Sequence, residues 1–361
     1  MDALIICGTA EPPPVVAGLL LLDRLVVELH RGGCEKITLG GRRGYPELKR
    51  AEALGIGVAT CLSMPAIQKP TLVLQGDVFV QRNDIARLIG EGGSLRGNFG
   101  EALPIAVLES GTPDAVKTMS PAATSNRPKG VAMRVRSTVE AKEASAQLWD
   151  TLTSSTDGMV DAFFNRPVGR LLSKFLVGTF VTPNQISVFA TLLGVLSGLL
   201  FAVGEYVPAL VAAVLLQISA VIDCVDGDVA RVAYKESVLG KWLDIVGDQV
   251  VHVTVFVGVG VGLWRAGFEG PALALGISAG IGVIVSFAVI LRGMSPQHRH
   301  NRRMQELIDK TTNRDFSVLL LFLAAGNHLW LFLWMVGIGV HVFWLIALTV
   351  QLTGGRKAAT E

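Results

Sequence analysis

Two apolar stretches, each long enough for a membrane-spanning helix, meet at a polar segment that carries four regularly spaced aspartates. The segment reads DCVDGDVARVAYKESVLGKWLDIVGD, and these aspartates are Asp223, Asp226, Asp244 and Asp248. The first two are three residues apart and the last two are four apart, and both spacings put side chains on one face of a helix. The sequence therefore predicts two helices with facing carboxylates, joined by a polar elbow near Lys235.

Carboxylates at the ends of membrane-spanning helices need a balancing positive charge. Each would cost roughly 2.5–3.5 kcal/mol if left bare at the centre of a spanning helix, and four on facing surfaces would repel one another. Hard divalent cations remove both penalties, since Mg²⁺ and Mn²⁺ prefer carboxylate oxygens. We therefore expect a divalent-metal site. The alternative is a pair of polar helix ends whose acids are simply solvated.

The spacing D-x2-D-G-x2-A-R-x8-G-x3-D-x3-D resembles the signature of the CDP-alcohol phosphotransferase family, and every signature position is filled. The resemblance implies a centre of two Mg²⁺ or Mn²⁺ ions, with four carboxylates as its ligands: Asp223, Asp226, Asp244 and Asp248. It also implies that Asp248 is the general base for the acceptor hydroxyl, which attacks the β-phosphorus of a CDP-alcohol while CMP leaves. Phosphoryl transfer depends mostly on positioning and charge neutralisation, which explains why ligands dominate the motif.

Four other signature positions are expected to contact the CDP group of the donor: Gly227, Ala230, Arg231 and Gly240. The glycines would let the nucleotide approach the backbone, although glycine is also common where membrane helices pack closely. Arg231 would pair with the diphosphate, although a basic residue at the cytoplasmic end of a span would also explain it.

The mean hydropathy of the chain is high, at +0.49, and the C-terminal half holds several apolar runs long enough to span a membrane. This half is therefore expected to be an all-α bundle of six transmembrane helices. The expected spans are 185–204, 207–232, 237–263, 271–291, 315–327 and 329–352. The fifth is short, so five spans are the alternative. With six, all basic loops fall on one side, which predicts a multi-pass protein of the cell (inner) membrane with both termini and the carboxylates in the cytoplasm.

The first 140 residues alternate strand-like and helix-like patterns, which predicts an α/β domain with a mostly parallel sheet. Strands are expected at 3–7, 36–39, 57–61, 71–79 and 103–108, and helices at 15–30, 46–53 and 83–89. The arrangement resembles the nucleotidyltransferase (cytidylyltransferase-type, Rossmann-like) fold, in which Asp77 would be a metal ligand. The first loop departs from that family, because GTAEPPP has three prolines without N–H donors and an acidic residue. We therefore expect a catalytically degenerate domain in which Asp77 is a turn residue.

The expected domains are a cytoplasmic nucleotidyltransferase-like domain (1–140), a linker with an interfacial amphipathic helix (141–184), the membrane domain (185–352) and a cytoplasmic tail (353–361). In the interfacial helix, Arg166, Arg170 and Lys174 would face lipid headgroups. The four cysteines show no metal spacing and indicate buried thiols.

The expected partners are a CDP-alcohol donor, an alcohol or polyol-phosphate acceptor and membrane lipids; a homodimer is possible by family resemblance, and nothing predicts nucleic-acid binding. A basic loop is the candidate acceptor site, with Arg299, Arg302, Arg303 and Arg314. Two other hypotheses stay open. In one, the N-terminal domain makes the CDP-alcohol from CTP; in the other, the chain is a cation transporter whose acids line the path.

Overall fold

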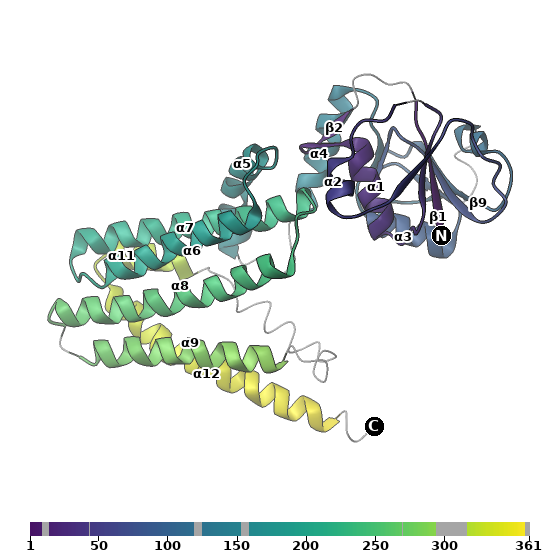
Figure 1. Cartoon of the computed structure of the whole chain (residues 1–361). Helices are drawn as coiled ribbons and strands as arrows, with labels where there is room; N and C mark the ends of the chain where they lie inside the picture. Colours follow the sequence, from purple (N-terminus) through teal and green to yellow (C-terminus); the bar gives the residue numbers. More distant parts are fainter. Residues whose placement is uncertain are drawn as a thin grey trace. The chain divides into compact units, whose positions relative to one another are not determined.

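A computed structural model of the chain describes residues 1–8, 14–42, 44–118, 125–152, 159–268, 270–293 and 316–357 (Figure 1). They form two compact units. Unit 1 comprises Met1–Leu152 with Val232–Tyr234, and unit 2 comprises Thr153–Arg231 with Lys235–Glu361. The prediction of an α/β domain followed by a helical region with long apolar helices is confirmed.

Unit 1 is built on a seven-stranded sheet with the order β10-β8-β9-β6-β1-β4-β5. The strands are β1 (Asp2–Ile6), β4 (Ile37–Gly40), β5 (Val58–Cys61), β6 (Thr71–Gln75), β8 (Ser94–Arg96), β9 (Ala102–Leu108) and β10 (Ser125–Asn126). The sheet is more mixed than expected, because β9 runs antiparallel to both β6 and β8. The short connection from β8 to β9 allows only a hairpin, in which the Gly97 N–H donates to the Glu101 carbonyl at 2.8 Å.

Two other segments differ from the sequence prediction. The expected helix 15–30 starts with a hairpin of β2 (Val15–Val16) and β3 (Leu19–Leu20), and α1 covers only Leu21–Arg31. The hairpin turn has φ of 44° at Ala17 and 81° at Gly18, the positive values of a tight primed turn. The expected strand 71–79 is divided by a turn at Gly76–Asp77 into β6 and β7 (Val78–Val80), and β7 pairs with β11 (Ala132–Arg134).

The remaining helices of unit 1 are α2 (Lys49–Ala53), α3 (Arg82–Glu91), the 3₁₀ helix η1 (Pro113–Thr118) and α4 (Thr138–Asp150). Helices α1 and α3 bury Leu25, Leu29 and Leu88 in the main core beside the sheet. Helix α4 begins with a capping box in which Ser137 accepts the Glu140 N–H. The pKa of Glu140 lies below its usual value, chiefly because the Arg136 backbone N–H donates to its carboxylate.

The tripeptide Val232–Tyr234 is part of the core of unit 1. The Tyr234 ring is buried, and its hydroxyl donates to Glu28 at 2.6 Å. The guanidinium carbons of Arg24 and Arg31 lie 5.1 and 5.0 Å from the ring centroid. Such cation–π contacts stabilise a buried aromatic ring between two charges.

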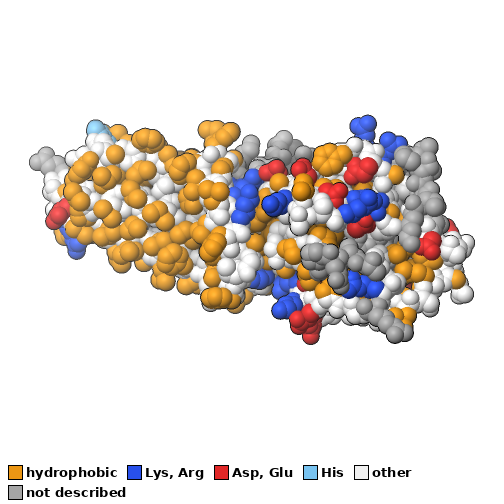
Figure 2. All heavy atoms as spheres, turned by 90° about the horizontal axis from the view of Figure 1, so that it is seen from above, with side chains coloured by type: hydrophobic (Ala, Val, Ile, Leu, Met, Phe, Trp, Pro, Cys, Tyr) orange, Lys and Arg blue, Asp and Glu red, His pale blue; other side chains and the backbone are white. Residues whose placement is uncertain are grey.

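Within the residues that the structure describes, unit 2 has a short π-helical segment, η2 (Asp161–Asn165), and seven α-helices. These are α5 (Arg166–Leu176), α6 (Pro183–Phe201), α7 (Tyr206–Val232), α8 (Val238–Arg265), α9 (Ala272–Gly293), α11 (Phe316–Ala325) and α12 (Leu329–Lys357). Hydrophobic side chains cover much of the face of this unit seen in Figure 2, whereas charged ones gather on unit 1. A membrane environment explains this exposed apolar surface.

Among the described residues, five helices are long and apolar enough to cross a membrane: α6, α7, α8, α9 and residues 329–352 of α12. The expected fifth of six spans is α11, which has 10 residues and reaches about 15 Å, half of the hydrocarbon thickness. Asn327, with φ of 58°, lies in the turn between α11 and α12. The part of the chain that the structure describes therefore has five long apolar helices and one shorter apolar helix, α11, where six spans were expected.

Glycines let the backbones of three long helices approach one another. A Cβ added to Gly198 of α6 would lie 2.6 Å from the carbonyl carbon of Thr254 on α8. A Cβ added to Gly260 of α8 would lie 2.7 Å from the Cα of Gly276 on α9. Neither position has room for a side chain, so α8 is held closely between α6 and α9, as is common for helices in membranes.

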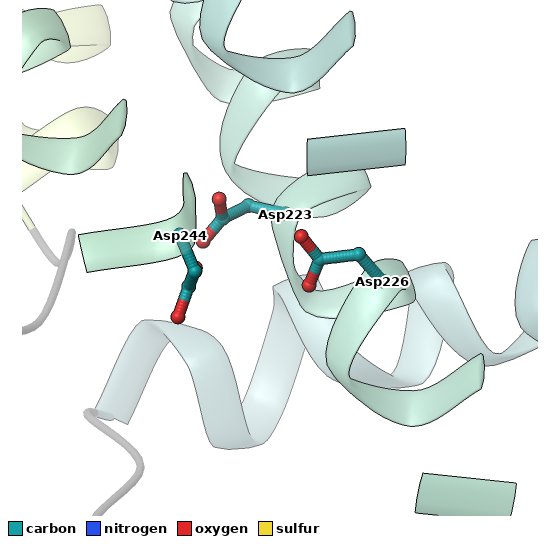
Figure 3. Close-up of side chains that lie close together, drawn as sticks. All are labelled: Asp223, Asp226 and Asp244. Atoms are coloured by element: carbon teal, nitrogen blue, oxygen red, sulfur yellow. The ribbon is translucent and has the colours of Figure 1, made fainter. Parts of the chain in front are cut away.

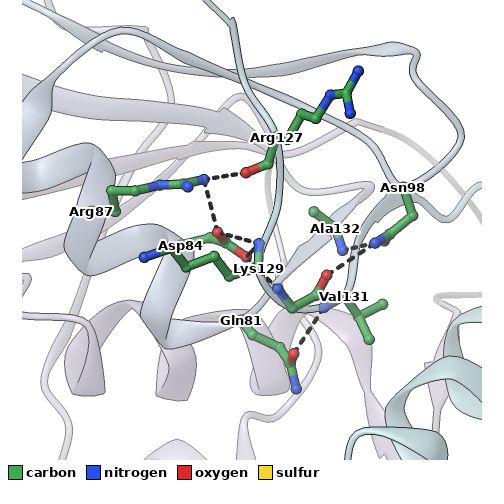
Figure 4. Close-up of polar contacts among 9 residues, drawn as sticks. Gln81, Asp84, Arg87, Asn98, Arg127, Lys129, Val131 and Ala132 are labelled. Carbon is green, nitrogen blue, oxygen red and sulfur yellow. Dashed lines mark hydrogen bonds and ion pairs between the residues drawn. The ribbon is translucent and has the colours of Figure 1, made fainter.

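A buried carboxylate organises one edge of unit 1 (Figure 4). Asp84 on α3 is fully buried and accepts backbone N–H groups from Lys129 at 2.9 Å and Gly130 at 3.0 Å. It also pairs with Arg87 at 3.0 Å, and Gln81 accepts the Val131 N–H at 2.8 Å. These contacts fix the chain that leads into β11.

Asp84→Ala is expected to destabilise unit 1 by about 3–5 kcal/mol, because it leaves Arg87 and two amides without their buried partner. The measurement is thermal unfolding of the full chain, followed by near-UV circular dichroism. Glu91→Ala is the matched control, since Glu91 lies on the same helix and is exposed. Equal melting temperatures for the two variants would contradict the structural role of Asp84.

Candidate active site

Three of the predicted carboxylates meet between two helices of unit 2. Asp223 and Asp226 lie near the C-terminal end of α7, and Asp244 lies near the N-terminal end of α8 (Figure 3). Each offers a carboxylate oxygen, and these oxygens all lie within 4.8 Å of one another. Helix α8 begins at the position that this geometry requires, because Ser237 is its N-cap and accepts the Gly240 N–H at 2.9 Å.

Asp248 lies one helical turn beyond Asp244 on α8. It lines the same small cavity, of about 190 Å³, as the other three aspartates. It is not part of the close three-carboxylate cluster. The structure therefore brings all four predicted aspartates to one cavity, with Asp248 apart from the tightest group.

A second cavity of about 540 Å³ adjoins the first and shares Asp226, Gly227, Arg231 and Asp244 with it. Its volume falls in the range of about 300–1,000 Å³ that is usual for small-molecule sites. All four residues predicted to contact the CDP group line it: Gly227, Ala230, Arg231 and Gly240. Lys235 and Lys241 join Arg231 as positive groups of the wall, which also carries Asp226, Glu236 and Asp244, so its three basic residues balance its three acids.

The two signature glycines differ in what surrounds them. At Gly240, an added Cβ would lie 2.8 Å from the Asn184 side-chain oxygen, so a larger residue would displace that side chain. At Gly227, the nearest atom to an added Cβ is Arg231 Nη2 at 3.4 Å, an ordinary contact. Both glycines line the cavity, and Gly240 is the more tightly packed of the two.

Asp228, which the sequence reasoning missed, holds two arginines at the site. It is almost fully buried and accepts from Arg166 Nη1 at 2.7 Å and from Arg231 Nη2 at 2.9 Å. Helix α5 reaches this point because Gly169 lies against α7, where an added Cβ would be 3.1 Å from the Val221 carbonyl oxygen. The prediction that Arg166 faces lipid headgroups is therefore wrong, since its partner is a buried carboxylate.

Residues 180–353 match the family model described as CDP-alcohol phosphatidyltransferase. This region is a domain of the CDP-alcohol phosphatidyltransferase family, and the match covers just under half of the chain.

Among curated proteins, the chain is similar to two named "Bifunctional IPC transferase and DIPP synthase". One, from Aquifex aeolicus (strain VF5), is 42% identical over 95 residues, which is 26% of this chain and 21% of that protein. The other, from Thermococcus kodakarensis, is 37% identical over 113 residues, or 31% of this chain and 25% of that protein. The matches thus span about a quarter of the length of these relatives.

A buried polar chain, also unpredicted, leads away from the site of this family domain. Asp161 accepts from the Asn165 side chain at 2.7 Å, and Asn165 accepts from Gln217 at 2.5 Å. Gln217 in turn accepts from Ser317 at 2.9 Å. The chain links η2, α7 and α11, and it satisfies polar groups that would be costly inside apolar helices.

The donor set fits a hard divalent cation. The three clustered side chains are all carboxylates, the ligand type that Mg²⁺ and Mn²⁺ prefer. Asp226 is also oriented by the Ser187 hydroxyl of α6, which donates to its Oδ2. Hydrogen bonds of this kind commonly fix the orientation of metal-binding carboxylates.

The four arginines expected to bind the acceptor (Arg299, Arg302, Arg303 and Arg314) lie outside the described residues. His252, one helical turn beyond Asp248 on α8, packs with its ring centroid 5.9 Å from that of Phe256 and 5.0 Å from that of Phe316.

Replacing Asp226 or Asp244 by Asn is expected to weaken Mn²⁺ binding by about tenfold or more, because a charged oxygen ligand is lost from the cluster. Mn²⁺ binding to the detergent-solubilised chain can be followed by electron paramagnetic resonance. Glu205→Gln is the control, since this exposed acid precedes α7, about 27 Å along the helix from Asp223. Unchanged affinity in both aspartate variants would exclude a metal centre at this cluster.

Proposed function

We propose that the chain is a divalent-metal-dependent membrane CDP-alcohol phosphotransferase, which transfers the phospho-alcohol of a CDP-alcohol to an acceptor hydroxyl and releases CMP. The observation that supports this most strongly is the cluster of three carboxylates, two of which, Asp226 and Asp244, line a cavity that also presents Arg231. A cation path for a transporter would need the acids, but it would not need Arg231 beside them.

We assign the proton transfer to Asp248, on the pattern of the family. It lines the carboxylate cavity without belonging to the tight cluster, so it can meet an acceptor hydroxyl at the edge of the cluster. Cations held by Asp223, Asp226, Asp244 and Asp248 would neutralise the diphosphate and its leaving group.

Arg231 is proposed to bind the diphosphate of the donor. The Asp228 carboxylate fixes one of its Nη groups, yet the side chain is 40% exposed and lines both cavities. An arginine anchored in this way presents its remaining N–H groups in a set direction, which favours paired hydrogen bonds to phosphate oxygens.

The substrates are proposed from the names of the relatives and from charge. On these grounds we propose a CDP-inositol-type donor and a polyol-phosphate acceptor, with CDP-diacylglycerol as the alternative donor. Lys235 and Lys241 would suit a second phosphate group. We further propose a multi-pass inner-membrane protein with the site on the cytoplasmic side, because basic residues cluster at that end.

The decisive assay is Mg²⁺-dependent CMP release by the purified chain in detergent, with CDP-inositol and CDP-diacylglycerol tested against a panel of alcohols and polyol phosphates. Asp248→Asn is expected to lower kcat by about 10²–10⁴, the usual contribution of a positioned base. Glu205→Gln should leave the rate unchanged. Full activity in Asp248→Asn would remove the assigned base.

Arg231→Lys is expected to raise the KM for the CDP-alcohol by about tenfold with a smaller effect on kcat, because lysine keeps the charge but loses the paired N–H geometry. Asp228→Asn should shift KM in the same direction, since it releases the Arg231 side chain. Steady-state kinetics with the donor varied provides the measurement. A change confined to kcat in both variants would argue against donor binding by Arg231.

Two further experiments test the alternative functions. Label from CTP appearing in a CDP-alcohol would make the chain bifunctional. Cation flux through liposomes without CMP release from any donor would favour a transporter.

A further inference from the structure

A third cavity, in unit 1, has no part in the proposed transfer reaction. It measures about 410 Å³ and lies where β1 and β6 end, beside Cys7, Gly8, Gly76 and Asp77. The Gly76 N–H donates to the Ile6 carbonyl at 2.8 Å, which holds the two strand ends side by side. The size is usual for a small-molecule site.

The strand order explains why a cavity forms at this point. After β1, the chain passes through α1 to β4 on one side of it and then outward to β5. It returns on the opposite side of β1 as β6, and both neighbours run parallel to β1. The connection after β1 thus leads toward β4, whereas the connection after β6 leads toward β8 and β9 on the opposite side of the sheet. In α/β sheets, ligands bind in the crevice between two strand ends whose connections diverge in this way.

The charge of the cavity does not fit the metal that a nucleotidyltransferase-like fold would place at Asp77. Asp77 Oδ2 accepts from Arg134 Nη2 at 2.7 Å and from Arg136 Nε at 3.1 Å. The guanidinium groups of Arg134 and Arg136 thus neutralise Asp77 through its Oδ2, whereas its Oδ1 is buried and accepts no hydrogen bond from the described residues. Together they exceed its charge. Of the two, Arg136 lines the cavity, and Arg42 adds a second positive group to the cavity wall.

Arg136 is positioned to meet a ligand. Its backbone N–H is fixed by the Glu140 carboxylate at 2.6 Å, and its side chain is 55% exposed. Only its Nε is engaged with Asp77; its Nη groups have no hydrogen bond to the part of the chain that the structure describes. The two Nη groups of Arg136, at a cavity that this residue lines, are suited to donate to phosphate oxygens.

The other walls define the rest of the ligand. Leu21, Leu22 and Pro46 present apolar surface beside the arginines. Burial raises the pKa of Cys7 to about 11, so its thiol adds no negative charge at neutral pH. The cavity therefore offers positive charge on one side and an apolar wall on the other.

We propose that this cavity binds a small phosphorylated metabolite without a divalent cation, with Arg42 and Arg136 holding the phosphate in place of a metal. The proposed ligand is a phosphate ester of a compact organic group, and the two classes that fit are nucleotides and polyol phosphates. This inference does not depend on the reaction assigned to unit 2.

The test is isothermal titration calorimetry of the detergent-solubilised full chain in EDTA, with CMP, inositol 1-phosphate and inorganic phosphate as probes. A background of Asp223→Asn removes metal-dependent binding at the carboxylate cluster. We expect one molecule of at least one ester bound per chain, and about a tenfold loss of affinity in Arg136→Ala. Arg82→Ala is the control, since Arg82 is exposed and does not line the cavity.

Asp77→Asn separates this proposal from a metal site. Removing the negative charge beside Arg136 should leave anion affinity unchanged or raise it, whereas loss of a metal ligand would abolish binding. The better of the two esters identifies the source of the phosphate. Binding that requires Mg²⁺, binding lost in Asp77→Asn, or no binding of any probe at millimolar concentration would each overturn the proposal.

Discussion

The concentration of negative charge between α7 and α8 is the constraint on which unit 2 depends. Carboxylate oxygens of three aspartates lie within 4.8 Å of one another. A further carboxylate, that of Asp228 on α7, is almost fully buried nearby. Repulsion among them is strong wherever water is scarce. The protein answers it in two ways. Asp228 is neutralised by Arg166 and Arg231, and the remaining carboxylates keep an open cavity in which cations can be held.

The buried pair of Asp228 and Arg166 also explains the path of the chain before the first long helix. Helix α5 carries exposed Leu171 and Phe175 on one side, which suits an interfacial position. Its N-terminal arginine is instead directed into the bundle. A buried ion pair contributes little net stability, so its value here is that it fixes where α5 and Arg231 lie.

How far the sequence predicts the structure depends on how local the signal is. The carboxylate spacing and the Thr182 cap of α6, which accepts the Gln185 N–H, were predictable because they follow from helical periodicity and capping. The β2–β3 hairpin was missed because its apolar residues also fit a helix, and only the turn at Gly18 distinguishes the two. The roles of Asp228 and Asp77 were not predictable, since each depends on an arginine far away in the sequence.

The glycine contacts of α8 have a mechanical consequence. Gly198 against Thr254 and Gly260 against Gly276 join α6, α8 and α9 almost backbone to backbone. Closely packed helices of this kind do not slide past one another without losing their contacts. The three helices therefore form a rigid group, and Asp244 lies on α8, its central helix. Any helix movement that admits substrates to the site is expected in elements outside this group, such as α5, α11 and α12.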